Sequence, residues 1–410
     1  MTRRRLRVIF YKQFFFLIFN CKLFLCKIQY VKLLKSDRHS ESVMKTEKLL
    51  ALLTLKKVPN LGDSSIKKLI RKVGSAEGVL LEKKANLLKI DGIGMIKIRE
   101  LHNPSYQAMA EEEFQFIENQ KISVHLYDEP EYPEKLKHCI DSPVVLFSKG
   151  TIDLAQKKLL SIVGTRKITN YGVQFCEELI ETLTPLDPVI ISGLAYGVDI
   201  TAHRAAVKHG LQTVACLAHG LNQIYPKVHQ KYVPEIEENG GFFTDFWSSD
   251  PFDRKNFLGR NRIIAGLSEA TVVIESASKG GSLVTADIAN SYNREVFAVP
   301  GRIGDVYSKG CNTLIKTQQA HMLTSAADLV YMLGWELEEK QKPAVQKQLF
   351  VELDEDEKKV YQFLKEKDKQ LLDSIALGCQ IPTFKVASVL LNMELKGLIR
   401  PLPGKLFELI

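Results

Sequence analysis

Residues 157–335 alternate short apolar segments with helix-like stretches, and this alternation limits the possible folds more than any other feature of the chain. The apolar segments are Leu159–Val163, Val189–Ser192, Thr213–Leu217, Thr271–Ile274 and Val296–Val299. Short continuous apolar runs are typical of strands covered on both faces, and helices between successive strands favour parallel pairing. The pattern therefore predicts an α/β domain with an extended, Rossmann-like, doubly wound and mostly parallel sheet.

Four of these segments end in turns that are rich in glycine and small polar residues. A single turn of this kind is usually structural, but the carboxyl ends of parallel strands meet at one edge of a sheet, where ligands bind. Glycine lets an oxygen approach the backbone, while hydroxyl and guanidinium groups donate hydrogen bonds to it. We therefore predict a phosphate site at this edge. Its candidate residues are Gly164, Thr165, Arg166, Ser192, Gly193, Gly280, Gly281 and Ser282.

A basic run, "DRKNFLGRNRIIAG", lies between two of the expected strands. Its cations are interleaved with Phe257 and Asn261. Cations that follow phosphates, together with a ring that stacks on a base, suit a single strand of nucleic acid. The alternative is a solvated run of charge, which the position of the run beside the glycine turns makes less attractive. The cations are Arg254, Lys255, Arg260 and Arg262.

Signals for catalysis, metals and cofactors are weak. There is no GxxxxGK[ST] and no GxGxxG, so neither a P-loop nor a nicotinamide site is expected. No paired cysteine or histidine spacing indicates a metal, and no cofactor is predicted. Glu275, at a strand end, is the one carboxylate placed for chemistry. Asp199 and His203 stand four residues apart on an expected helix, where the two side chains could pair.

The region before the α/β domain looks like a helical module over residues 44–115. Two segments, "VPNLGDSSIKKLI" and "IDGIGMIKIREL", resemble the turns of helix-hairpin-helix or SAM-like modules. The first is degenerate, because Asn60 stands where a glycine is expected. Such a module either contacts DNA or packs without a ligand, and both interpretations stay open. We assign residues 116–335 to the Rossmann-like domain, including the segment "PVVLFSKG", which suggests an edge strand.

The C-terminal region divides into a polar linker, 336–350, and a small domain, 351–410. Three helical patterns and two strands around a Pro-Gly turn predict a winged-helix-like domain. Its candidate recognition helix, "PTFKVASVLLNMELKG", carries only Lys385, Glu394 and Lys396. A helix that reads DNA is normally more basic, so contact with protein is at least as well supported.

The net charge of +8 comes from residues 1–43, which hold ten Lys and Arg residues against two acidic ones. This tail is apolar, but its uninterrupted part is too short to cross a bilayer. We interpret it as sequence upstream of a misplaced start codon, with Met44 as the start; a membrane anchor is the alternative. Seven scattered cysteines fit a reduced, cytoplasmic setting.

The central motifs together resemble the DNA-processing protein A family (DprA, also called Smf). They are "IVGTRKITNYG", "ISGLAYGVDITAHRAAV", "GRNRIIAGLSEATVVIESASKGGSLVTADIA", "FAVPG" and "KGCNTLIKTQQAHML", within about residues 130–335. The resemblance implies an extended Rossmann domain that binds single-stranded DNA and forms a homodimer. It further implies protection of incoming DNA during natural transformation and loading of RecA recombinase, with no enzymatic activity.

Carried over by motif, the three glycine turns would hold DNA phosphates, and Arg260, Asn261 and Arg262 match the family's Arg-Asn-Arg signature. Lys309, before the "GCN" turn, would also face the strand. Asp245 and Cys311 depart from the residues that are common in the family. An enzyme of the phosphoribohydrolase type remains the alternative, although "SKGGSLVTADI" lacks that class's Pro-Gly-Gly-x-Gly-Thr turn and its downstream Glu.

Overall fold

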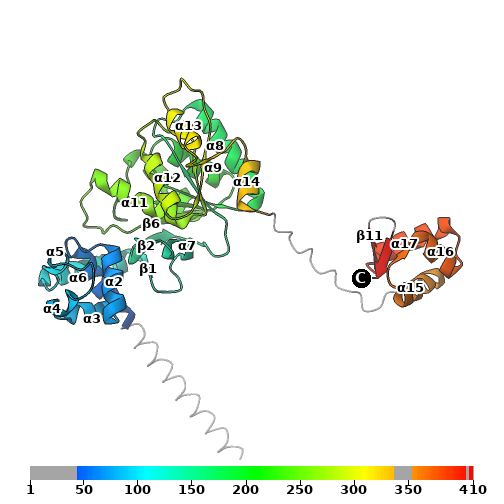
Figure 1. Cartoon of the computed structure of the whole chain (residues 1–410), viewed down its shortest axis with the longest axis horizontal. Helices are drawn as coiled ribbons and strands as arrows, with labels where there is room; N and C mark the ends of the chain where they lie inside the picture. The colour runs from blue at the N-terminus through cyan, green and yellow to red at the C-terminus, as the bar shows by residue number, and fades with distance from the viewer. Residues whose placement is uncertain (1–43, 337–352, 403–405, 410) are drawn as a thin grey trace, which may run out of the picture. The chain divides into compact units, whose positions relative to one another are not determined.

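A computed structural model describes residues 44–336, 353–402 and 406–409 (Figure 1). The chain forms two compact units, one that ends at Glu336 and one that begins at Leu337, and each is described by itself. The expected tail over 1–43, nearly all of the expected linker over 336–350 and the Pro403-Gly404 turn lie outside the described residues.

The first unit is built on a nine-stranded sheet with the order β1-β2-β6-β5-β4-β3-β7-β8-β9. All strands from β6 to β9 along this order pair in parallel, and β2 pairs antiparallel with both β1 and β6. The predicted Rossmann-like, mostly parallel sheet is therefore confirmed. The strands are β1 (Ser123–Leu126), β2 (Val145–Gly150), β3 (Leu159–Val163), β4 (Val189–Ser192), β5 (Thr213–Cys216), β6 (Gly240–Thr244), β7 (Ala270–Val273), β8 (Glu295–Ala298) and β9 (His321–Met322).

Helices cover both faces of this sheet, as the continuous apolar strands require. In β3, Leu160 and Ile162 pack into the core beneath one helical layer, while Leu159 and Val163 pack into the other. The first layer holds α8 (Asn170–Leu183), α9 (Val198–Lys208) and α14 (Ala326–Leu333). The second holds α7 (Glu134–Lys137), α11 (Arg254–Leu267), α12 (Gly281–Ser291) and α13 (Lys309–Lys316). A short helix, α10 (Val233–Glu238), packs beside β6.

Two differences from the sequence analysis concern the strands. The segment "PVVLFSKG" contains β2, which is not an edge strand, because β1 pairs with its free side. Strands β1, β6 and β9 were not predicted from the sequence. Strand β6 begins with Gly240 and Gly241, whose φ angles are 145° and 153°, and paired glycines normally indicate a loop.

The N-terminal module is helical, as predicted. Its helices span residues 44–57, α2 (Asp63–Val73), α3 (Ala76–Leu81), α4 (Lys84–Leu87), α5 (Met95–Ile98) and α6 (Pro104–Gln120). In the first hairpin Asn60 adopts a left-handed φ of 64°, and in the second Gly92 has φ of 73°. Asparagine tolerates this conformation better than most residues, so Asn60 does what glycine does in the other hairpin.

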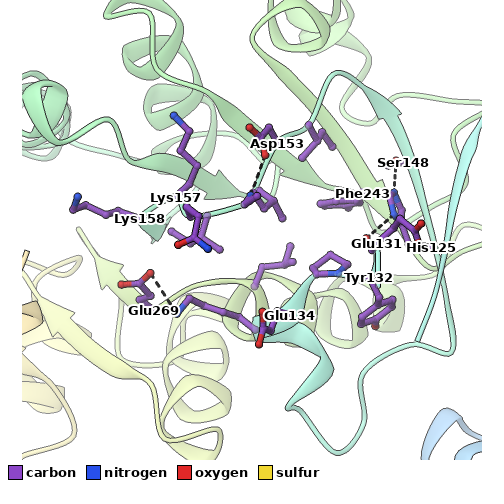
Figure 2. A pocket seen from close by; sticks show the side chains of 18 of the residues that line it. His125, Glu131, Tyr132, Glu134, Ser148, Asp153, Lys157, Lys158, Phe243 and Glu269 are labelled. Atoms are coloured by element: carbon purple, nitrogen blue, oxygen red, sulfur yellow. Dashed lines mark hydrogen bonds and ion pairs between the residues drawn. The ribbon is translucent and has the colours of Figure 1, made fainter. Parts of the chain in front are cut away.

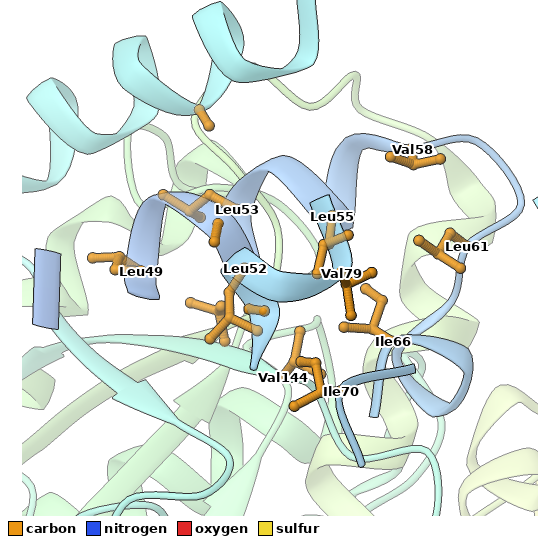
Figure 3. Packing of buried hydrophobic residues seen from close by; sticks show 14 of the residues in the cluster. Leu49, Leu52, Leu53, Leu55, Val58, Leu61, Ile66, Ile70, Val79 and Val144 are labelled. Carbon is orange, nitrogen blue, oxygen red and sulfur yellow. The ribbon is translucent and has the colours of Figure 1, made fainter. Parts of the chain in front are cut away.

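This module shares a hydrophobic core with the edge of the sheet (Figure 3). Leu52 and Ile70 belong to the same buried cluster as Val144, the residue before β2. Phe147 and Trp247 complete the cluster from the sheet side. The module is therefore fixed to the α/β domain by packing and forms part of the same compact unit.

The second unit has the three helices and small sheet of a winged helix, as predicted. Its elements are α15 (Glu355–Lys367), β10 (Gln370–Leu371), α16 (Leu372–Cys379), α17 (Thr383–Leu395), β11 (Ile399–Leu402) and β12 (Leu406–Leu409). The strands pair in the order β10-β12-β11. Val360, Ile375, Val386 and Leu390 form the centre of a core that belongs to this unit alone.

Within the described ranges, no single helix is long and apolar enough to cross a membrane. Within these ranges, α16 and α17 taken together reach the required length and composition, but they are bent by 107°.

Candidate phosphate-binding site

A pocket of about 640 Å³ opens at the carboxyl ends of β3, β4 and β7. Between β3 and β7 the strand order changes direction, and this is the point at which open α/β sheets bind ligands. Gly164 and Arg166 line the pocket after β3, Ala195 after β4, and Ser276 and Gly281 after β7. The pocket therefore contains most of the turns that the sequence analysis placed at one edge.

The turn after β3 is held rigidly. The Thr165 N–H donates to the carbonyl of Glu275 at 2.7 Å, and the Val198 N–H donates to the Thr165 carbonyl at 3.1 Å. A side chain at Gly164 would place its Cβ 2.4 Å from Cγ2 of Val198, so only glycine fits there. This frame projects Arg166 outward, where its exposed guanidinium lies 5.5 Å from the centre of the Phe257 ring.

The turn after β7 leads directly into α12. Gly280 caps the helix without a side chain, and Gly281 and Ser282 both line the pocket. Ser282 Oγ donates to Ser276 Oγ at 2.9 Å, which fixes the two hydroxyls side by side. Since the first N–H groups of a helix lack intrahelical partners and carry the positive end of its dipole, this turn suits a phosphate oxygen.

Arg260 on α11 provides a positive charge in the wall of the pocket, where it is only 4% exposed. Its Nη1 donates to the carbonyls of Gly193, at 2.7 Å, and Cys216. Its Nε has no hydrogen-bond partner in the described residues. Burial lowers the pKa of Arg260 and nearby Asp199 opposes this effect, while burial raises the pKa of Asp199 despite the attraction of Arg260. A guanidinium stays protonated in proteins, so the pocket holds a poorly hydrated cation that favours an anion.

Three aromatic rings gather at the mouth of the pocket. Tyr225 lies 4.6 Å from Phe252 between ring centres, and Phe252 lies 5.5 Å from Phe257. All three line the pocket, and Tyr225 and Phe252 are among the exposed large apolar side chains. Phe257 was predicted from the sequence to meet a base, whereas Tyr225 and Phe252 were not. Their signal was an aromatic residue beside a proline in "NQIYP" and "SDPF".

Two predicted ligands have different roles in the structure. Ser192 is fully buried, and its Oγ donates to the carbonyl of Ile162 at 2.6 Å. Arg262 pairs with Asp245 and, at 3.2 Å, with Asp63 of the N-terminal module. Although burial opposes it, the attraction of Asp245 and Asp63 raises the pKa of Arg262. Neither Ser192 nor Arg262 lines the pocket, and we do not include them among its phosphate ligands.

The remaining predicted residues lie in or beside the pocket. Asn261 lines it and donates through Nδ2 to the carbonyl of Gly281 at 3.4 Å. The Gly193 carbonyl holds Arg260, as described above. Lys309 is exposed at the start of α13 and does not line the pocket. It is adjacent to the β7 turn, because the N–H of Gly310 donates to the Ser276 carbonyl at 2.8 Å.

The candidate for chemistry, Glu275, is committed to structure. One carboxylate oxygen accepts from the N–H of Thr169 at 2.9 Å and the other from its hydroxyl at 2.5 Å, at the start of α8. Glu275 is buried and does not line the pocket. In the part of the chain that the structure describes, no group of three or more His, Cys, Asp or Glu side chains is arranged to hold a metal ion.

A larger pocket, of about 920 Å³, lies around the start of β3 and is also lined by β1 and β2 (Figure 2). His125 lies between Ser148 Oγ, 2.8 Å from Nε2, and the carbonyl of Glu131, 3.1 Å from Nδ1. Carboxylates such as Glu269 alternate here with cations such as Lys158. Mixed charge at the amino ends of parallel strands does not suit phosphate, so we assign the site to the smaller pocket.

The fold and this pocket define a class: a Rossmann-type protein with a crevice that suits phosphate and is edged by aromatic rings, joined to a helical module and a winged helix. The model of the DNA recombination-mediator protein A family matches residues 123–334, and that of the DprA winged helix domain matches residues 344–405. The chain belongs to this family of DNA-processing proteins, as its sequence motifs indicated.

Relatives of this chain include the Smf protein of Escherichia coli, which is 34% identical over 67% of this chain and 74% of that protein. The X-ray structure of DNA processing protein A from Streptococcus pneumoniae matches with a TM-score of 0.59 and 32% identity, over 68% of this chain and 95% of that one. A structure of DNA processing protein A from Helicobacter pylori, described for its single-stranded DNA binding mode, is 28% identical over 52% of this chain and 95% of that one, with a TM-score of 0.47.

Proposed function

We propose that the pocket binds single-stranded DNA. Arg166 and the N–H groups of the Gly280–Ser282 turn hold phosphates, and the charge of Arg260 draws a phosphate inward. The observation that carries the proposal is the contact between Arg166 and the Phe257 ring at the pocket mouth. A cation that follows the backbone beside a ring that accepts a base is the arrangement that single-strand binders use.

The aromatic cluster favours a single strand over a duplex. In a duplex the faces of the bases are stacked on one another and cannot reach Tyr225, Phe252 or Phe257. Stacking on aromatic side chains is worth about 1–3 kcal/mol per base and tolerates any sequence. Binding should therefore depend on strandedness and salt, and little on base sequence.

The protein acts on DNA by binding rather than by catalysis in this proposal. Glu275 is occupied by Thr169 and does not line the pocket, and Asp199, the carboxylate that lines it, accepts from the N–H of Ala195. Its relatives are named as DNA processing proteins. We infer a cytoplasmic protein that protects incoming single strands during natural transformation.

We further propose that the protein forms a homodimer and delivers the bound strand to RecA recombinase. Strand β9 is a short edge of the sheet, and Met322 on it is exposed. Tyr331 and Met332 on the neighbouring α14 are exposed as well. Exposed apolar side chains at an open sheet edge support a protein contact there.

The proposal is tested by titrating labelled poly-dT and a duplex of mixed sequence at two salt concentrations. We expect tighter binding to the single strand and a fall in affinity as salt rises, because bound phosphates release counterions. Equal affinity for both forms, or hydrolysis of nucleotides at an enzymatic rate, would contradict it.

Arg166→Ala should weaken binding to single strands of every sequence by roughly tenfold, because one charge-assisted phosphate contact is lost. The slope of log affinity against log salt should fall by about one. Arg204→Ala is the matched control: Arg204 also lies over a ring, 5.6 Å from the centre of Tyr232, but outside the pocket. An equal loss of single-strand affinity in both variants would contradict a role for Arg166 in binding the strand.

A further inference from the structure

The solvent face of α17 carries a row of large apolar side chains. Phe384 is 81% exposed, Leu391 56% and Leu395 79%. The opposite face of the same helix fills the winged-helix core. A helix that is apolar on all sides is normally buried on all sides, so this outer face lacks a partner within its own unit. The core residues of α17 are Val386, Val389, Leu390 and Met393.

This face is poorly suited to a nucleic acid, although α17 occupies the position of a recognition helix. Lys385 pairs with Asp356 at 2.5 Å. Lys396 pairs with the buried Glu357 at 2.6 Å. Both lysines are thus paired with carboxylates of α15, and the other charged residue of α17 is Glu394. A surface that binds nucleic acid needs cations that displace the counterions of the phosphates. The outer face of α17 presents hydrocarbon instead.

We propose that the outer face of α17 binds the same face of a second copy of the chain, with the two helices antiparallel. Phe384, Ser388, Leu391 and Leu395 are spaced by four, three and four residues, which is the seam of a helix pair. In an antiparallel pair with a two-fold axis, Phe384 lies opposite Leu395 of the second copy. Ser388 then lies opposite Leu391 of the second copy. The small serine accommodates the leucine at the centre, so the row is complementary to itself.

The charges beside the row are compatible with this pairing. In an antiparallel pair, the residues that flank the row on one side of the helix face the residues that flank it on the same side of the second copy. Lys385 then faces Asn392 of the second copy, and Glu394 faces Ala387. The antiparallel pair therefore brings no two like charges together. In a parallel pair, each side chain of the row would instead lie opposite the identical residue of the second copy, so Phe384 would meet Phe384 and Ser388 would meet Ser388.

The area of this contact predicts a weak association. Each large apolar side chain buries on the order of 100–200 Å². Three from each copy give roughly 600–1,200 Å², at or below the lower limit for a stable specific interface. The pairing should therefore be visible at high protein concentration, or wherever another contact already holds two copies together. The inference does not rest on DNA binding, because none of its residues belongs to the pocket.

The test is sedimentation equilibrium of the full-length protein over a wide concentration range. Leu391→Glu should raise the dissociation constant of the concentration-dependent association at least tenfold, whatever oligomer the rest of the chain forms. Leu395→Glu should do the same. Both side chains point away from the core, so the thermal unfolding of the variants should match that of the unaltered protein. Leu81→Glu is the control, since Leu81 on α3 is also a highly exposed leucine.

Orientation is tested by the double variant Ser388→Lys/Leu391→Glu. In the antiparallel pair each lysine lies opposite a glutamate of the second copy, so association should recover relative to Leu391→Glu. In a parallel pair lysine would oppose lysine, and recovery would fail. The proposal is overturned if Leu391→Glu and Leu395→Glu leave association unchanged, if Leu81→Glu disrupts it equally, or if the double variant shows no recovery.

Discussion

At the scale of single residues, Gly193 sets how closely Arg260 and Asp199 can approach the β4 turn. A Cβ on Gly193 would lie 2.5 Å from Nη1 of Arg260 and 2.6 Å from Oδ2 of Asp199. The guanidinium and the carboxylate therefore pack directly against the backbone of this turn. The glycine is required for the space that the missing side chain leaves, and not for its φ angle.

Gly193→Ala should consequently displace Arg260 and weaken binding to single-stranded DNA. Overpacking of this kind costs about 1–3 kcal/mol of stability, so the thermal midpoint should fall together with DNA affinity. Gly259→Ala provides the control, because a Cβ there meets nothing within 4 Å and the position lies within α11. If Gly193→Ala leaves both measurements at their original values, the packing explanation fails.

His203 has a structural role that differs from the pairing with Asp199 suggested by their spacing. Thr213 Oγ1 donates to the carbonyl of Ile190, so Nδ1 of His203 must be the donor to Thr213 Oγ1, at 2.7 Å. Nε2 is then a buried acceptor that has no hydrogen-bond partner among the residues that the structure describes. Burial lowers the pKa of His203 from 6.5 to about 3, and His229 and Arg260 add to the effect. Asp199 instead accepts from the N–H of Ala195.

This arrangement predicts loss of stability in acid. Below pH 6.5 the unfolded chain binds a proton that the folded chain refuses until about pH 3, so stability falls as the pH falls through that window. Below the unfolded pKa of His203, each unit by which the pH falls lowers the free energy of unfolding by about 1.4 kcal/mol. His203→Asn can keep the bond to Thr213 without titrating. Its denaturant midpoint should therefore change less between pH 7 and pH 5 than that of the unaltered protein; an identical change would exclude His203 as the cause.

At the scale of elements, α11 connects the pocket with the N-terminal module. Arg260 and Arg262 are two residues apart, and on a helix such side chains point in nearly opposite directions. Arg260 therefore faces the pocket, while Arg262 faces Asp63 of α2 and Asp245 after β6. In the Arg-Asn-Arg signature, Arg260 thus supplies a cation to the pocket, and Arg262 supplies one to the junction between the N-terminal module and the sheet.

Arg262→Ala should destabilise the first unit by about 1–3 kcal/mol, because the buried carboxylates of Asp63 and Asp245 lose their nearer counter-ion and keep Lys56, at 3.9 and 3.7 Å. The salt dependence of DNA binding should stay unchanged, since no phosphate contact is removed. Chemical denaturation and DNA titration in two salts measure the two effects. The opposite result, unchanged stability with a smaller salt slope, would restore Arg262 as a phosphate ligand.

The elements that were predictable from sequence are those with a strong local pattern. Strands β3, β4, β5, β7 and β8 are continuous apolar runs, and each was found. Strand β6 begins with two glycines, and β9 has only two residues, so their pairing depends on neighbours distant in sequence. Strand β2 lies inside the sheet because β1 pairs with it, and nothing in the residues of β2 indicates that partner.

At the scale of the whole molecule, the two units have separate cores, and every residue that lines the candidate phosphate pocket lies between Val163 and Thr285. Removing residues 337–410 should therefore change single-strand affinity by less than about twofold, or 0.5 kcal/mol. The same truncation should abolish the association assigned to α17. Fluorescence titration and sedimentation of the truncated protein measure both, and a large loss of affinity would place part of the DNA interface in the second unit.

The amino-acid sequence alone was sufficient for the class of fold, for the family, and for the expectation that the glycine turns meet at one edge of the sheet, because these follow from local periodicity and from short motifs. The tertiary structure decided which side chains of those motifs are free to meet a ligand. Ser192 and Arg262 are bound to partners inside the protein. Tyr225 and Phe252 join Phe257 at the pocket, and the apolar row of α17 has no partner within the second unit. These outcomes depend on the direction of each side chain and on the groups brought against it by distant parts of the chain, which no local pattern records.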